Sequence, residues 1–166
     1  MSFSSPNVLS TTAEYALRMM IALCEADGRP MTSVQLSHRT DVSPDYAVKI
    51  LQQLGRAGYV RAQRGRGGGF RLACNPGTTT LLDLVRVIDS LDRITKCPLG
   101  RIEHAGNLCA LHASIDRAIG VLHDELRAHT LSDLLEDARG TICAAEDKPV
   151  QINIDHRTNG ATPHSN

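Results

Sequence analysis

The stretch "DVSPDYAVKILQQLGRAGYVRAQRGRGGGFRLA", residues 41–73, decides the fold. Ser43 is a good helix N-cap, and Pro44 follows it at the first helical position, where its missing N–H costs nothing. Ala57 and Gly58 then end the helix. Between these limits, apolar residues recur with helical spacing and predict one buried face, formed by Ala47, Ile50, Leu51 and Leu54.

A shorter helix is predicted just upstream. Thr32 and Gln35 have the spacing of a capping box, and they open a helix that runs to about Arg39. A short capped helix, a tight turn and a longer helix with a polar outer face are typical of a helix-turn-helix, although any three-helix bundle shows the same periodicity. In a helix-turn-helix, the first turn of the second helix meets base edges, here through Ser43, Asp45, Tyr46 and Lys49.

The segment that follows favours DNA binding. Residues 59–63 and 70–73 alternate as short strands around "RGRGGG". Glycines such as Gly67 and Gly68 let the backbone turn sharply and approach a ligand closely, and Arg64 and Arg66 place two cations at the tip. A plain hairpin does not need those arginines, and a phosphate-binding loop would need a helix directly after the glycines. We therefore predict a winged helix-turn-helix with its arginines on phosphates or in the minor groove.

Three further helices complete a mainly α-helical fold. Thr11 and Glu14 have capping-box spacing at the start of a helix that Asp27 and Gly28 end. Thr80 caps a later helix, and the last long helix ends near Ala128. The predicted buried faces are Ala16, Met19, Met20 and Leu23 in the first helix; Leu81, Leu84, Val85, Ile88 and Leu91 in the second; and Leu111, Ile115, Ala118, Ile119, Leu122 and Leu126 in the third.

Composition and charge narrow the class of protein. No apolar run reaches the roughly 18 residues of a membrane span, and the N-terminus lacks a signal-peptide layout, so we expect a cytoplasmic protein. Disulfides are rare there, so the five cysteines are better read as core thiols, ligands or redox groups. Residues 1–72 hold nine Lys and Arg against five Asp and Glu, and the rest holds nine against thirteen. This asymmetry suits a polyanion partner for the first half, although a solvated basic face explains it too.

Several motifs together resemble the Rrf2 family of bacterial transcription regulators. They are "LSTTAEYALRMMIALC", the stretch 41–73 quoted above, and "HTLSDLL", and the resemblance covers roughly residues 8–140. It implies a dimeric winged-helix regulator, usually a repressor, which binds a double-stranded DNA operator and often senses redox state, iron–sulfur status or nitric oxide. It also implies that the stripe of the long helix packs against a second copy rather than only on its own domain.

The resemblance divides the chain into three parts. Residues 1–75 form the winged helix-turn-helix domain. Residues 76–142 form a dimerisation and sensor region, with a cluster loop at 93–110. Beyond the resemblance, residues 143–166 are polar and lack a helical stripe, so we expect a flexible tail there.

The loop and the start of the next helix read "TKCPLGRIEHAGNLCALH", residues 95–112. Cluster-bearing members of the family carry three cysteines here, and some add a histidine. Cys97, Cys109 and His112 match the first cysteine, the third cysteine and that histidine, whereas Glu103, followed by His104, stands where the middle cysteine is expected. The resemblance therefore implies a [2Fe–2S] cluster with an incomplete ligand set, and iron accepts imidazole and carboxylate as well as thiolate.

The remaining ligand and the type of sensing stay open. The resemblance implies Glu14 of the partner subunit as the fourth ligand, with His104 and Glu103 as alternates. Glu14 can instead be a capping-box residue without a metal-binding role, and His104 and Glu103 can be solvated loop residues. A metal-free switch by oxidation of Cys97 and Cys109, or no sensing role, are the alternatives.

Other classes of function fit poorly. The sequence has no Ser/His/Asp set, no phosphate loop and no HExxH motif, so we expect no enzyme. A protein-interaction module that uses a winged helix without DNA is a third option.

Overall fold

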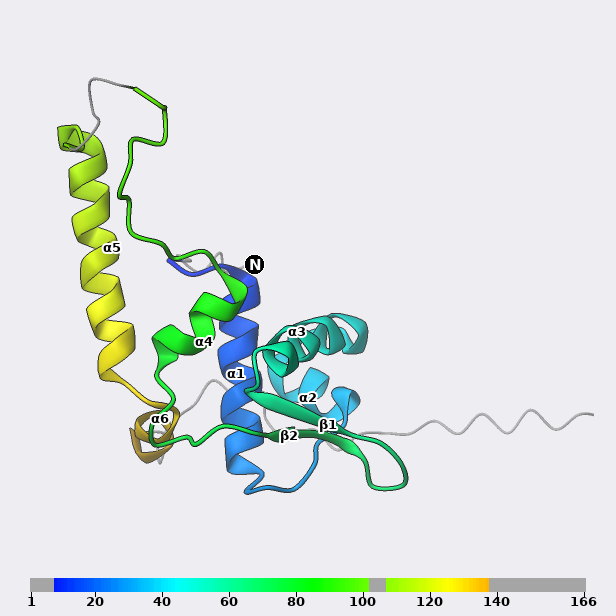
Figure 1. Ribbon diagram of the computed structural model, residues 1–166. Coiled ribbons are helices and arrows are strands. Elements are labelled where there is room, and N and C mark those ends of the chain that lie inside the picture. The colour runs from blue at the N-terminus through cyan, green and yellow to red at the C-terminus, as the bar shows by residue number, and fades with distance from the viewer. Residues whose placement is uncertain (1–7, 102–106, 138–166) are drawn as a thin grey trace, which may run out of the picture.

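The computed structural model describes residues 8–101 and 107–137 (Figure 1). Glu103, His104, Cys143 and the predicted tail lie outside the described residues. The fold is mainly helical with one antiparallel hairpin, as predicted. In chain order the elements are α1 (Thr11–Glu25), α2 (Ser33–Thr40), α3 (Pro44–Arg56), β1 (Val60–Gln63), β2 (Gly69–Leu72), α4 (Leu81–Ile88), α5 (Ala110–Ala128) and α6 (Leu131–Asp137).

Local capping sets the helix-turn-helix. Thr32 and Gln35 form the predicted capping box on α2. Asp41 ends α2 in the left-handed conformation, with φ 54°, and so reverses the chain within a few residues. The Ser43 side chain accepts a hydrogen bond from the backbone N–H of Tyr46 and caps α3. The predicted stripe of α3 is buried, at 1 % exposure or less for all four residues.

The hairpin is joined to the rest of the domain by backbone contacts. In the β1–β2 register, Arg61 faces Arg71 and Gln63 faces Gly69. Phe70 also exchanges two hydrogen bonds with Met31, the residue before the cap of α2, at 2.9 and 2.7 Å. Gly69 allows this approach, because a Cβ there would lie 2.5 Å from the Met31 carbonyl oxygen. The wing and the helix-turn-helix are therefore one structural unit.

The capping box predicted for α1 is wrong by one residue. Ser10 is the N-cap and accepts from the backbone N–H of Ala13 at 3.1 Å, whereas Thr11 is the first helical residue. A distant carboxylate favours this choice: Asp89 accepts hydrogen bonds from the Ser10 backbone N–H at 3.0 Å and from the Ser10 hydroxyl at 2.7 Å. A carboxylate at a helix N-terminus is favourable because the helix dipole is positive there.

Helices from both ends of the chain meet in one core. α4 begins with the predicted Thr80–Asp83 capping box. It ends at Ile88, because the backbone of Asp89 is extended. Leu91, which the sequence predicted to lie in this helix, therefore lies outside it. Leu131 of α6 is fully buried against the same core. That core also holds side chains of α1, α2, α3, β1 and α4.

The long helix α5 stands beside this core rather than in it (Figure 1). Its one fully buried residue is His123. Leu111, Ile115 and Val121 are exposed at 65 %, 42 % and 64 %. The sequence predicted that Leu111 and Ile115 are buried, but in a single chain both are exposed to solvent. No helix in the described parts is long and apolar enough to cross a bilayer.

Candidate DNA-binding surface and cysteine loop

The start of α3 presents a polar surface. Asp45 and Lys49 are exposed, whereas the Ser43 oxygen is already used as the helix cap. Tyr46 is only partly exposed, at 36 %, and its hydroxyl lies 2.6 Å from the Thr12 hydroxyl of α1. Its ring also meets the Tyr15 ring edge-on, at a centroid distance of 6.4 Å. Tyr46 is thus tied to α1, a contact that local sequence patterns did not reveal.

The wing tip is a glycine-shaped turn between two exposed cations. Arg64 and Arg66 are both exposed. Gly68 donates its backbone N–H to the Gly65 carbonyl at 2.9 Å, and Gly67 has φ 78°. A Cβ on Gly68 would lie 2.4 Å from the Gln63 carbonyl oxygen. Gly67 and Gly68 therefore shape the tip, and the arginines supply its charge.

Sequence reasoning missed a second pair of arginines on the hairpin. Arg61 and Arg71 face each other in the strand register, where like charges are unfavourable. The Arg71 Nε is buried and has no hydrogen-bond partner among the described residues. The two residues line one hollow along the hairpin. The sequence could have indicated this pair, because Arg61 lies three residues before Arg64 and Arg71 lies five residues after Arg66, on the two predicted strands. They extend the basic surface of the wing along its strands.

The cysteine loop brings three predicted ligands together. Cys109 is the N-cap of α5, and its sulfur lies 3.4 Å from the His112 Nδ1. The Cys97 sulfur, from the segment before the loop, lies 4.0 Å from the same nitrogen. In the described part of the chain, no three His, Cys, Asp or Glu side chains form a closed metal site. Both sulfurs lie near the same imidazole nitrogen, and a metal site here would need shorter contacts and a further donor.

The fourth predicted ligand lies elsewhere. Glu14 is in the first turn of α1, with its carboxylate 3.6 Å from the Arg18 guanidinium. Figure 1 shows this end of α1 well apart from the start of α5, so a single chain does not bring Glu14 to the sulfurs. Of the other cysteines, Cys24 has a raised pKa, because it is partly buried and lies near Cys74, which favours the protonated thiol over a ligating thiolate.

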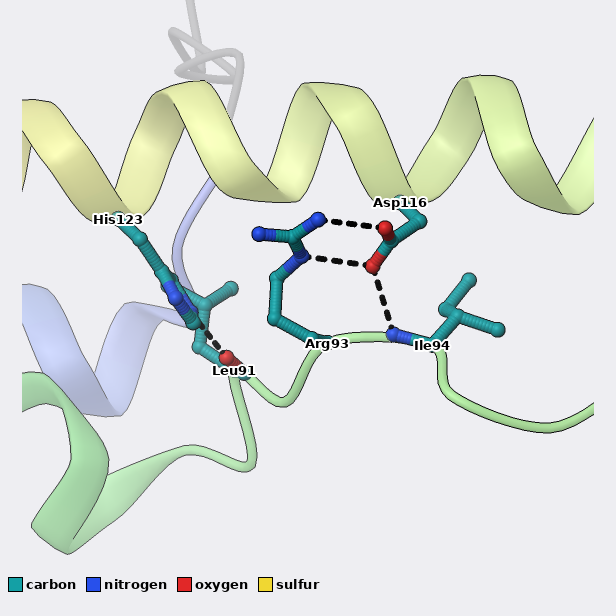
Figure 2. A network of polar contacts seen from close by, with 5 residues as sticks. All are labelled: Leu91, Arg93, Ile94, Asp116 and His123. Atoms are coloured by element: carbon teal, nitrogen blue, oxygen red, sulfur yellow. Dashed lines mark hydrogen bonds and ion pairs between the residues drawn. The ribbon is translucent and has the colours of Figure 1, made fainter.

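A polar network holds the segment before the loop against α5 (Figure 2). Asp116 accepts from Arg93 through Nε at 2.7 Å and Nη2 at 2.6 Å, and from the Ile94 backbone N–H at 2.9 Å. These hydrogen bonds, the one to Arg93 first, lower the pKa of Asp116 to about 2. Buried His123 donates its Nε2 proton to the Leu91 carbonyl oxygen.

Comparison with known proteins identifies the family. Residues 9–137 match the Rrf2 family, described as an iron-dependent transcriptional regulator. The chain belongs to the Rrf2 family. The match includes the helix-turn-helix, the wing, α5 and the cysteine loop, and the family is one of DNA-binding transcriptional regulators, not of enzymes. The match confirms the predicted family and its role as a transcriptional regulator rather than an enzyme. The likeness to a solved structure confirms the predicted fold class.

Solved Rrf2 structures share the fold. IscR of T. potens is 23 % identical, with a TM-score of 0.64 over 78 % of this chain and 87 % of that one. CymR (YrzC) of B. subtilis, described as the global cysteine regulator, is 26 % identical, with a TM-score of 0.64 over 78 % and 96 %. CymR of Staphylococcus aureus in its oxidized form is 23 % identical, with a TM-score of 0.61 over 77 % and 95 %.

Proposed function

We propose that this Rrf2 protein is a homodimeric repressor whose operator affinity is controlled by a [2Fe–2S] cluster that senses redox state, iron–sulfur status or nitric oxide. The observation that carries the proposal is the convergence of the Cys97 and Cys109 sulfurs on the His112 Nδ1, at 4.0 and 3.4 Å. Thiolate and imidazole are both ligands that iron–sulfur clusters use, so the donor set fits the group.

The cluster needs four protein ligands, and one chain supplies three in this arrangement. Glu14 of the partner subunit is the proposed fourth, with His104 and Glu103 as alternates. When bound, the cluster would supply an oxidation- and nitric-oxide-sensitive group. Imidazole can be protonated and carboxylate binds iron weakly, so we expect the cluster to be more labile and more pH-sensitive than one with four cysteines.

The exposed side of α5 supports the dimer. Leu111 and Ile115 lie one turn apart on one face of this helix and are both exposed. A second copy related by two-fold symmetry would cover this stripe with its own equivalent helix. The two winged domains would then bind a two-fold-related operator, with α3 in the major groove and the wing arginines on the backbone.

The test is anaerobic purification followed by a visible absorption spectrum and analysis of iron and sulfide. Cys97→Ala and Cys109→Ala should each abolish iron binding, and His112→Ala and Glu14→Ala should reduce it. Cys74→Ala is the matched control, because Cys74 is a free, half-buried thiol outside the loop, and it should keep full iron content. Loss of iron in the control as well, or in none of the variants, would overturn the proposed site.

A metal-free thiol switch is the second candidate. It is favoured by the same geometry, because both sulfurs lie within 4.0 Å of one imidazole nitrogen. A CymR structure of the same fold is described as an oxidized form. An operator affinity that responds to peroxide in preparations without iron, and that loses this response in Cys97→Ser, would favour the switch over the cluster.

A further inference from the structure

Residues 89–97 connect the winged domain to the cysteine loop and touch both. The segment leaves α4 at Asp89 and reaches Cys97, which lies next to His112. Between these ends it has no helix or strand of its own, and it is held by Ser10, the N-cap of α1, and by Asp116 of α5. Any shift of the loop therefore acts on a segment with defined contacts at each end.

One face of α5 makes the contacts on the sensor side. His112, Asp116, Gly120 and His123 follow one another at spacings of three or four residues, so they share that face. His112 meets the two sulfurs, and Asp116 binds Arg93 and the Ile94 backbone one turn later. Gly120 leaves room for the guanidinium, because a Cβ there would lie 3.0 Å from the Arg93 Nη1.

The other end of the segment holds the first turn of α1. The Asp89 carboxylate takes both hydrogen bonds from Ser10, and the Ser10 oxygen in turn caps α1 through Ala13. Two residues after the cap, Thr12 is hydrogen-bonded to the hydroxyl of Tyr46 in the first turn of α3. The N-terminus of α1 thus joins residues 89–97 to α3, the second helix of the helix-turn-helix.

We propose that Asp116 and Asp89 are positioning residues that couple the cysteine loop to the first turn of α3. A change of ligation or oxidation at Cys97 and Cys109 alters how His112 and the start of α5 sit against the loop. Asp116 passes that displacement to Arg93 and Ile94, and Asp89 passes it to the cap of α1 and so to Tyr46. The role in signalling rests on the function proposed above, whereas the mechanical link between the two carboxylates and Tyr46 does not.

The first experiment measures operator affinity by fluorescence anisotropy in the two states of the loop, cluster-loaded and cluster-free. Allosteric coupling between sites is commonly about 5- to 150-fold. Asp116→Asn and Asp89→Asn each remove a charge and one acceptor oxygen. We expect both to lower the affinity ratio between the two states by about fivefold or more, with iron content unchanged. The affinity ratio should fall no further in the double variant than in the single variants, because the two contacts act in series.

Asp124→Asn is the matched control. Asp124 lies on the same helix, in an exposed pair with Arg127 at 3.4 Å, and its side chain is 80 % exposed. It should keep the ratio of the unaltered protein. An unchanged ratio in Asp116→Asn and Asp89→Asn would overturn the signalling role and leave the sensor function standing. An unaltered protein whose affinity is the same in both states would overturn the sensor function instead.

The second experiment tests the mechanical link without iron or DNA. Hydrogen–deuterium exchange is followed in peptides covering residues 10–14 and 43–47 of the cluster-free protein. Loss of a helix-capping contact commonly speeds local opening by about fivefold, so Asp116→Asn and Asp89→Asn should raise exchange in both peptides by about that factor. Asp124→Asn should not. An increase in exchange in residues 10–14 only, with the exchange of residues 43–47 unchanged, would refute the link to α3.

Discussion

The wing arginines give the sharpest test of how this Rrf2 protein holds DNA. Arg64 and Arg66 are exposed on a tip whose turn is set by glycines, and the described residues place no carboxylate in an ion pair with either. Each cation is therefore available for a phosphate. We predict that Arg64→Ala and Arg66→Ala weaken binding to every duplex and lower its dependence on salt.

The magnitude follows from counterion release. Each neutralised phosphate contributes about 0.9 to the slope of log affinity against log salt. When salt rises from about 50 to about 200 mM, one such contact therefore costs about 3.5-fold in affinity, and two cost about 12-fold. Because each of the two wings of the proposed dimer carries both arginines, the double variant lacks four such contacts, and its affinity should fall about 150-fold less over this range than that of the unaltered protein.

The assay is fluorescence anisotropy on two duplexes, an operator selected from a random-sequence pool and a scrambled version. The wing variants should weaken both, whereas Lys49→Ala should reduce the discrimination between them, by about 1–3 kcal/mol if Lys49 meets a base edge. Arg127→Ala, an exposed arginine on α5, is the matched control and should leave the slope unchanged. A double wing variant with the original slope would refute phosphate binding by the tip.

Three further predictions concern stability, titration and assembly. Gly69→Ala should lower the free energy of unfolding by roughly 2–4 kcal/mol in urea, because its Cβ meets the Met31 backbone, whereas Gly77→Ala, whose Cβ has no neighbour closer than 3.5 Å, should not. The pKa of Asp116 is lowered to about 2, so its ion pair with Arg93 stabilises the fold fully above about pH 4, and this stabilisation is lost as the pH falls through about 2. A carbon-13 titration of the Asp116 carboxyl group that gives an ordinary pKa would contradict this. Ile115→Asp should give a monomer by light scattering at micromolar concentration, and an unchanged dimer would exclude the α5 stripe as the interface.

The sequence was most informative where structure is decided locally. Thr32, Ser43 and Thr80 cap helices as predicted, because each side chain accepts a hydrogen bond from the backbone N–H three residues further on. The wing followed from strand alternation and glycines; β1 starts one residue later than predicted and ends where predicted, and β2 lies one residue earlier than predicted at both ends. The apolar stripe of α3 was found because helical periodicity alone defines its buried face.

Contacts between distant residues were beyond this reasoning. Ser10, Thr11 and Thr12 are all capping types, and the carboxylate of Asp89, 79 residues away, favours the first of them. The pairing of Arg93 with Asp116 had no signal in spacing, and neither did the contact of Tyr46 with Thr12. For the cysteine loop, the family resemblance supplied the candidate ligands, and the structure places Cys97, Cys109 and His112 side by side.

The backbone bridge between Met31 and Phe70 leads to an expectation about how the protein would leave DNA. Because these hydrogen bonds tie the hairpin to the segment that enters α2, we expect the wing to move together with the helix-turn-helix. A dimer that changes the spacing of its two domains would then withdraw the helix from the major groove and the arginines from the backbone in one motion. Nuclease protection of a half-site should accordingly vanish as a whole over a narrow range of signal, without a partially protected intermediate in which only the wing has let go.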